Sequence, residues 1–153
     1  MGGGAGLHRG GPVGAPQGLR KPDLLFYDGG CGLCHRAVRF LVARDRREAF
    51  RFAPLGGETF LRTVVPEERV GLPDSLVVAT SGGRLLTRSR AVLHLLRGLG
   101  GGWGVVGRVA AILPPRWVDG LYEAVARRRG GWFRAPDQAC PHLPGGQRAR
   151  FDP

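Results

Sequence analysis

The spacing of apolar positions divides the first half of this chain into short segments of alternating character. Residues 24–28 form an apolar run of the length typical of a buried strand. Over about residues 31–44, apolar side chains recur at helical spacing with arginines between them, which predicts an amphipathic helix. Residues 50–53 alternate and predict a second strand, and residues 58–65 suit a second helix that ends near Pro66.

The following segments extend this alternation. Residues 75–79 predict a third strand, and the Ser-Gly-Gly-Arg run at 81–84 is a hairpin turn that leads into a fourth strand at 85–87. Ser89 can cap a further helix, which the glycines of residues 98–104 break. The resulting order, β-α-β-α-β-β-α, predicts an α/β protein with a thioredoxin-like fold.

The second half of the chain is predicted to be helical. Residues 105–113 and 117–129 suit two helices separated by Pro114-Pro115, which we expect to pack on the core as an extension. The first residues are rich in glycine and proline and lack periodicity, which is typical of disorder. We therefore expect a disordered tail at 1–22, a thioredoxin-like core at 23–98, and a helical extension with a C-terminal tail at 99–153.

Two cysteines, Cys31 and Cys34, open the first predicted helix after a strand and a glycine turn. Unpaired N–H groups at a helix start carry partial positive charge, which stabilises a thiolate. A Cys-x-x-Cys pair in this context is typical of redox proteins. We predict that Cys31 is the attacking thiolate and that Cys34, one turn later, resolves the mixed disulfide. The alternative is a buried pair of unreactive thiols.

Two further residues are candidates for supporting roles. Asp28 lies three positions before Cys31, where it can relay a proton or simply cap the turn or helix, the commoner role of an aspartate there. A close carboxylate would also oppose thiolate formation. Pro73 lies just before the third strand, where thioredoxin-like folds place a cis-proline, although an ordinary proline at a strand start fits equally well.

The strong positive charge changes this picture little. The chain carries 23 basic and 12 acidic residues, a net charge of +11, and 27 glycines, a composition that coding bias explains more simply than nucleic-acid binding. No nucleic-acid motif accompanies the charge, so we expect no specific nucleic-acid partner. The arginines at 127–129 suit a solvated helix end.

Cysteine content and hydropathy favour a reducing compartment. Three cysteines are too few for a disulfide-stapled secreted scaffold, and the first residues lack the apolar core of a secretory signal. The longest apolar stretch, residues 105–113, is too short to span a membrane. We therefore expect a cytoplasmic protein with no membrane span.

Other chemistry remains open for the same cysteines. With His35 the pair matches a c-type haem attachment sequence, but that would need an export route and usually a distal ligand, and Met1 is the only methionine. Cys140 and His142 could join the pair in a zinc site, although Cys-Pro-His is tight for a zinc knuckle. Cys140 can also serve as a third thiol or simply be packed or free. We expect no metal and no cofactor.

Three aromatic residues of the C-terminal region allow two interpretations. Trp117, Trp132 and Phe133 can line a substrate groove. At their spacing in a helical extension, packing in the core is the expected role.

The block from Tyr27 to Cys34, followed by Val38-Arg-Phe-Leu and Arg44-Asp45, resembles the opening of the DCC family of thiol-disulfide oxidoreductases. The resemblance covers about residues 24–151 and implies a thioredoxin-like fold with thiol-disulfide activity. Its signature residues are Asp28, Cys31 and Cys34. Similar later blocks lie at 51–55, 74–78, 86–89, 91–96, Tyr122, 126–129, 132–133, Cys140 and 150–151.

These observations together predict a thiol-disulfide oxidoreductase. Its Cys31–Cys34 dithiol would exchange disulfides with protein or low-molecular-weight thiol substrates and would be restored by an external reductant or oxidant. The alternative is a non-enzymatic module on the same fold, zinc-stabilised or acting through its basic surface.

Overall fold

The computed structural model of this chain describes residues 21–73, 76–132 and 145–153. Most of the predicted N-terminal tail therefore lies outside the described residues. So do Phe133, Cys140 and His142, and nothing is described of the Trp132 side chain.

Four strands form one mixed sheet in the order β2-β1-β3-β4. β1 pairs in parallel with β2 and antiparallel with β3, which pairs antiparallel with β4. This is the thioredoxin-like arrangement, so the predicted fold and element order are confirmed. The elements are β1 (Asp23–Tyr27), α1 (Gly32–Arg44), β2 (Phe50–Pro54), α2 (Glu58–Thr63), α3 (Pro66–Arg69), β3 (Val77–Ala79), β4 (Leu85–Thr87) and α4 (Arg88–Leu99).

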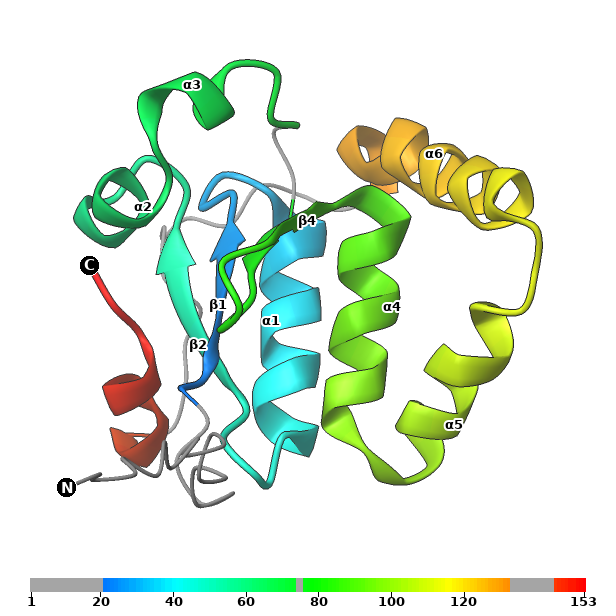
Figure 1. Cartoon of the computed structure of the whole chain (residues 1–153), viewed down its shortest axis with the longest axis horizontal. Helices are drawn as coiled ribbons and strands as arrows, with labels where there is room; N and C mark the ends of the chain where they lie inside the picture. The colour runs from blue at the N-terminus through cyan, green and yellow to red at the C-terminus, as the bar shows by residue number, and fades with distance from the viewer. Residues whose placement is uncertain (1–20, 74–75, 133–144) are drawn as a thin grey trace, which may run out of the picture.

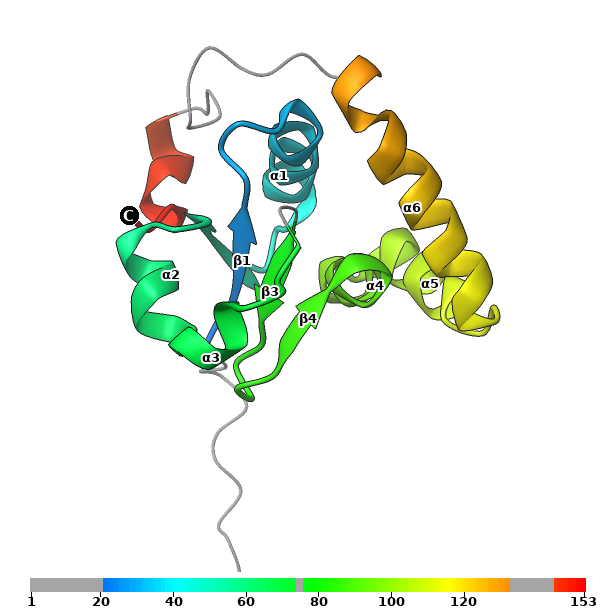
Figure 2. The ribbon, with the colours of Figure 1, turned by 90° about the horizontal axis from the view of Figure 1, so that it is seen from above.

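Helices cover both faces of the sheet, with α1 and α4 on one side and α2 and α3 on the other (Figures 1 and 2). The twofold alternation of a strand explains this layering. In β1, Leu25 and Tyr27 belong to the cluster under α1 and α4, whereas Phe26 belongs to the cluster under α2 and meets Phe60 edge to face at 5.1 Å. β1 is thus buried on both faces, which explains its continuous apolar run.

The glycines of residues 98–104 break the chain less than the sequence predicted. α4 continues to Leu99, and Gly100 and Gly101, with φ 67° and 52°, turn the chain into α5 (Gly101–Ala110). Gly98 lies inside α4, where a Cβ would overlap the Phe50 ring, so its glycine serves close packing rather than helix termination.

Two other helix boundaries also differ from the prediction. The second predicted helix ends at Thr63, and Pro66 begins the separate short helix α3, because proline fits the first helical position. Thr87, not Ser89, is the N-cap of α4. Ser89 is buried inside the first turn of α4. Its hydroxyl donates to Asp119 of the later helix α6 (Pro115–Trp132).

After α5 the chain forms α6 (Pro115–Trp132), which crosses the N-terminal end of α4 on the side of the molecule away from α2 (Figure 2). Trp117, expected in the core, is 71 % exposed, because α6 packs through the opposite side of the helix. Within the part of the chain that the structure describes, no helix is both long and apolar enough to cross a membrane.

The last residues return to the sheet as a short helix, η1 (Gly145–Arg150), beside β2. Phe151 bridges Phe52 in parallel and stacks on its ring at 5.1 Å. Arg150 is buried, pairs with the Asp45 carboxylate and donates to the Phe50 carbonyl at 2.8 Å. We call residues 145–153 the C-terminal clasp, because they fix the end of α1 and the edge strand β2 together.

Candidate active site at the start of helix α1

The candidate site lies at the carboxyl end of β1, where a tight turn leads into α1. The Asp28 carboxylate accepts the Gly30 N–H at 2.8 Å, and its carbonyl accepts the Cys31 N–H at 3.2 Å. Asp28 therefore forms the turn that presents the cysteines, in agreement with the capping interpretation.

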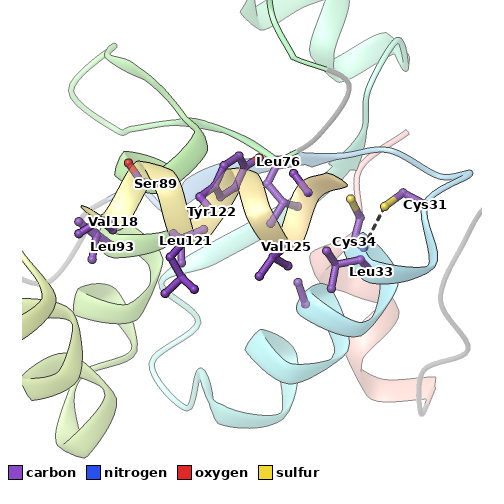
Figure 3. A pocket seen from close by; sticks show the side chains of 13 residues that line it. Cys31, Leu33, Cys34, Leu76, Ser89, Leu93, Val118, Leu121, Tyr122 and Val125 are labelled. Atoms are coloured by element: carbon purple, nitrogen blue, oxygen red, sulfur yellow. Dashed lines mark hydrogen bonds between the residues drawn. The ribbon is translucent and has the colours of Figure 1, made fainter. Parts of the chain in front are cut away.

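Cys31 is the N-cap of α1, and its Sγ accepts the Cys34 N–H at 3.3 Å (Figure 3). This is the position that Ser, Thr or Asp usually occupies, with sulfur in place of oxygen. Cys31 thus lies at the electropositive start of a helix, where reactive cysteines are typically found. Cys31 is half-buried and not in a disulfide, so a substrate can reach it.

Cys34 lies one turn further on and is only 3 % exposed. Burial, followed by a hydrogen bond to Cys31 and the charge of Cys31, raises the pKa of its thiol from 9.0 to about 12. The Asp28 backbone acts in the opposite direction and the Asp28 carboxylate in the same direction as burial. Near pH 7 the Cys34 sulfur is therefore a protonated thiol.

His35 lies on α1 beside Cys34, as predicted, and faces the protein interior. Its Nε2 lies 3.0 Å from the Gly29 carbonyl, and its ring meets Tyr27 edge to face at 5.9 Å. Tyr27 in turn meets Phe151 at 6.3 Å. A row of aromatic rings thus connects the turn before Cys31 with the C-terminal clasp.

An apolar groove of about 310 Å³ opens beside the two cysteines. Its walls come from the first turns of α1 and α4, from the residue before β3, and from one side of α6 (Figure 3). The lining residues are Cys31, Leu33, Cys34, Ala37, Leu76, Ser89, Val92, Leu93, Val118, Leu121, Tyr122, Val125 and Ala126.

Polar contacts hold α6 in place as the wall of this groove. Ser89 in the first turn of α4 donates to Asp119, and Arg88 lies 3.8 Å from Glu123. On α6 the sequence suggested only Trp117 and Trp132 as possible groove residues, and Trp117 does not line this groove. The signal was present, because the lining positions 118, 121, 122, 125 and 126 have the spacing of one helix face.

Two further hypotheses from the sequence concern Pro73 and a zinc site. Pro73 is half-buried, and the described residues contain no cis peptide bond, so Leu72–Pro73 is trans. Within residues 21–73, 76–132 and 145–153, no three His, Cys, Asp or Glu side chains are grouped to hold a metal. The zinc hypothesis that includes Cys140 and His142 falls outside these ranges.

A thioredoxin-like fold with a Cys-x-x-Cys pair at the start of its first helix defines a class of redox proteins that work through thiols. Comparison with known families agrees: the family described as DCC1-like thiol-disulfide oxidoreductase matches residues 25–135. The chain belongs to this family, as the sequence resemblance implied, and the family supports a redox role.

Two known proteins are similar to this chain over most of its length. The chain is 32 % identical to the uncharacterized protein YuxK of Bacillus subtilis over 114 residues, 72 % of this chain and 80 % of that protein. It is 28 % identical to the chloroplastic DCC family protein At1g52590 of Arabidopsis thaliana over 117 residues, 76 % of this chain and 68 % of that protein. No solved structure matches the chain significantly.

Proposed function

We propose that this protein is a thiol-disulfide oxidoreductase whose Cys31–Cys34 dithiol exchanges disulfides with protein or low-molecular-weight thiol substrates. The observation that carries the proposal is the asymmetry of the two sulfurs. Cys31 is accessible and receives an N–H hydrogen bond at a helix start, whereas Cys34 is buried one turn below it and protonated. Stepwise exchange requires this difference between an attacking and a resolving thiol.

In the reducing direction, the Cys31 thiolate attacks one sulfur of a substrate disulfide. A bond forms between Cys31 and that sulfur, the substrate disulfide breaks, and the first substrate thiolate leaves. Cys34 then attacks the Cys31 sulfur and loses its proton, and the second substrate sulfur leaves as a thiol. Two electrons have passed from the dithiol to the substrate, and an external dithiol restores the protein.

Asp28 has a supporting role in this proposal. Its backbone and carboxylate set the turn that places Cys31 at the helix start, and its charge acts on Cys34. Because Cys34 must lose a proton as it attacks, we propose that the Asp28 carboxylate, whose charge acts on Cys34, receives it. Asp28 would thereby speed resolution of the mixed disulfide rather than its formation.

Trapping tests the order of attack. In a background with Cys140→Ser and with a substrate disulfide added, the Cys34→Ser variant should accumulate a mixed disulfide with one substrate sulfur while the other leaves as a thiolate, whereas Cys31→Ser should trap none. Mass spectrometry of the unreduced protein identifies the adduct and the modified cysteine. Equal trapping by both variants would refute the assignment of the nucleophile. Stoichiometric bound zinc in place of reactive thiols would refute the function itself.

The direction of the reaction follows from the reduction potential. Equilibration of the full chain with glutathione or dithiothreitol buffers measures it, with the Cys31–Cys34 disulfide quantified by mass shift after alkylation. A potential close to that of thioredoxin, about −270 mV, would make the protein a reductant. A potential of about −120 mV would make it an oxidant.

A further inference from the structure

We infer that the groove beside Cys31 is a binding site for an apolar segment of a polypeptide substrate, so that the protein selects disulfides whose cysteine is followed or preceded by large hydrophobic side chains. This inference rests on the proposed function, because a groove beside Cys31 can select disulfide substrates only if Cys31 reacts with disulfides.

The chemistry of the groove is the first support. Its lining includes leucines and valines from three helices, and the Ser89 hydroxyl is already engaged by Asp119. A polar thiol such as glutathione would gain little from such walls, whereas burial of a Leu or Phe side chain is favourable. The groove therefore discriminates by hydrophobicity.

The shape of the groove points to a polypeptide rather than to an enclosed small molecule. Its volume of about 310 Å³ is at the lower end of ligand pockets, about 300–1,000 Å³, and suits one or two large side chains. One wall is open, because Leu121 and Val125 on α6 remain 67 % and 44 % exposed. A chain can pass along this open side while its side chains enter the groove.

The position of the groove beside Cys31 determines which substrate side chains it would contact. Cys31 and Cys34 belong to its lining, so a disulfide that reaches Cys31 already lies at the groove (Figure 3). An extended chain advances about 3.3–3.6 Å per residue, so the side chains in the groove are those within a few residues of the substrate cysteine. Exposed Leu121 and Val125 then become hydrophobic partners that a substrate covers.

Peptide selectivity tests this inference. The full chain with Cys34→Ser and Cys140→Ser is mixed with two neutral peptides, each carrying one cysteine as a thionitrobenzoate disulfide. One peptide has Leu-Phe after the cysteine and the other Ser-Asn. Release of thionitrobenzoate gives the rate constant. Because the leaving group is the same, we expect the apolar peptide to react about tenfold faster, as burial of one large side chain predicts.

Variants on α6 locate the selectivity. Leu121→Gln with Val125→Asn should reduce the ratio of the two rate constants to within about twofold. Both side chains are exposed, so the fold should tolerate the change. The matched control is Ile112→Gln, which alters an 83 % exposed apolar residue outside the groove and should leave the ratio unchanged.

The outcomes separate the groove from the dithiol. Similar rates for both peptides in the unaltered groove, or a ratio that the α6 variants do not change, would overturn the inference while the proposed function stands. No release from either peptide and none from thionitrobenzoate disulfide with a small neutral thiol would overturn both. Sedimentation velocity of the same samples reveals a dimer if a second copy fills the groove, and a dimer dissociated by Leu121→Gln would likewise overturn the inference.

Discussion

The C-terminal clasp makes a strong prediction about stability, because it contains a buried ion pair. The Asp45 side chain is 1 % exposed, and its carboxylate pairs with Arg150. Asp45 also accepts the Ala49 and Phe50 N–H groups at 3.0 and 3.1 Å. Arg150→Met removes the cation, and among the described residues the buried carboxylate then keeps these two backbone donors.

The expected cost follows from burial. Removal of one partner of a buried pair costs about 3–5 kcal/mol, because the remaining charge stays desolvated. Arg150→Met also removes the donors to the Phe50 carbonyl at 2.8 and 3.2 Å. A domain of this kind is stable by about 5–15 kcal/mol, so the variant loses a large part of its free energy of unfolding. By contrast, Arg62→Met breaks the exposed pair with Glu58 at 3.6 Å and should cost less than about 1 kcal/mol.

Urea denaturation of the reduced protein, followed by circular dichroism and linear extrapolation, measures these free energies. The double variant Asp45→Asn with Arg150→Met is the decisive control. Asparagine keeps an oxygen for one of the two backbone donors and carries no charge, so the double variant should be more stable than Arg150→Met alone. The reasoning is wrong if Arg150→Met costs less than about 1 kcal/mol, or if the added Asp45→Asn gives no recovery.

Further predictions concern the cysteines and the glycines. Cys31→Ser should lower the pKa of Cys34 from about 12 but leave it above 9.0, because burial is the largest cause; ultraviolet absorbance of the thiolate against pH checks this. Asp28→Asn should also lower the Cys34 pKa, because the Asp28 charge raises it. It should nevertheless slow resolution of the mixed disulfide at least tenfold in stopped-flow assays, because the proton acceptor is lost. Faster resolution in this variant would show that Asp28 is not the proton acceptor. Gly98→Ala should cost about 1–3 kcal/mol in thermal unfolding, because its Cβ overlaps a buried ring. Gly120→Ala, on an open part of α6, should instead stabilise the protein by about 0.5–1 kcal/mol.

The sequence predicted the core of the fold because its signals are local. The apolar run of residues 24–28 and the helical spacing of 31–44 place β1 and α1 to within about one residue. The turn chemistry of Asp28 and the two glycines after it places the cysteines at a helix start. Each of these features depends on neighbours in the chain, so no knowledge of tertiary packing was needed.

The clasp was missed because it depends on residues far apart in sequence. Arg150 and Asp45 are 105 positions apart, and the sequence predicted only a C-terminal tail, with residues 150–151 matching a block of the family resemblance. One signal was available. Asp45 directly follows α1, where an acidic residue is unfavourable beside the negative end of the helix dipole. A carboxylate in that position indicates that some cation compensates it, although sequence alone does not identify Arg150.

The path of α6 explains why its residues were misjudged. The pattern predicted a helix there, with Trp117 and Trp132 packed in the core. Periodicity shows which residues share a face but not what that face meets. Val118, Tyr122 and Ala126 line the groove, whereas Trp117 faces outward at 71 % exposure. Contact with α4 through Asp119 determines this orientation, and that contact is again non-local.

The groove is built from both the predicted core and the predicted helical extension. The predicted core of residues 23–98 supplies both cysteines, the Asp28 turn and one side of the groove, but α6 supplies the opposite wall. A fragment limited to that core would retain both cysteines, but it would lose the wall that we propose selects substrates and the C-terminal clasp that stabilises Asp45 and β2. If both proposals hold, thiol reactivity and selectivity depend on different segments, and a substitution on the exposed side of α6 should change selectivity without changing thiol reactivity.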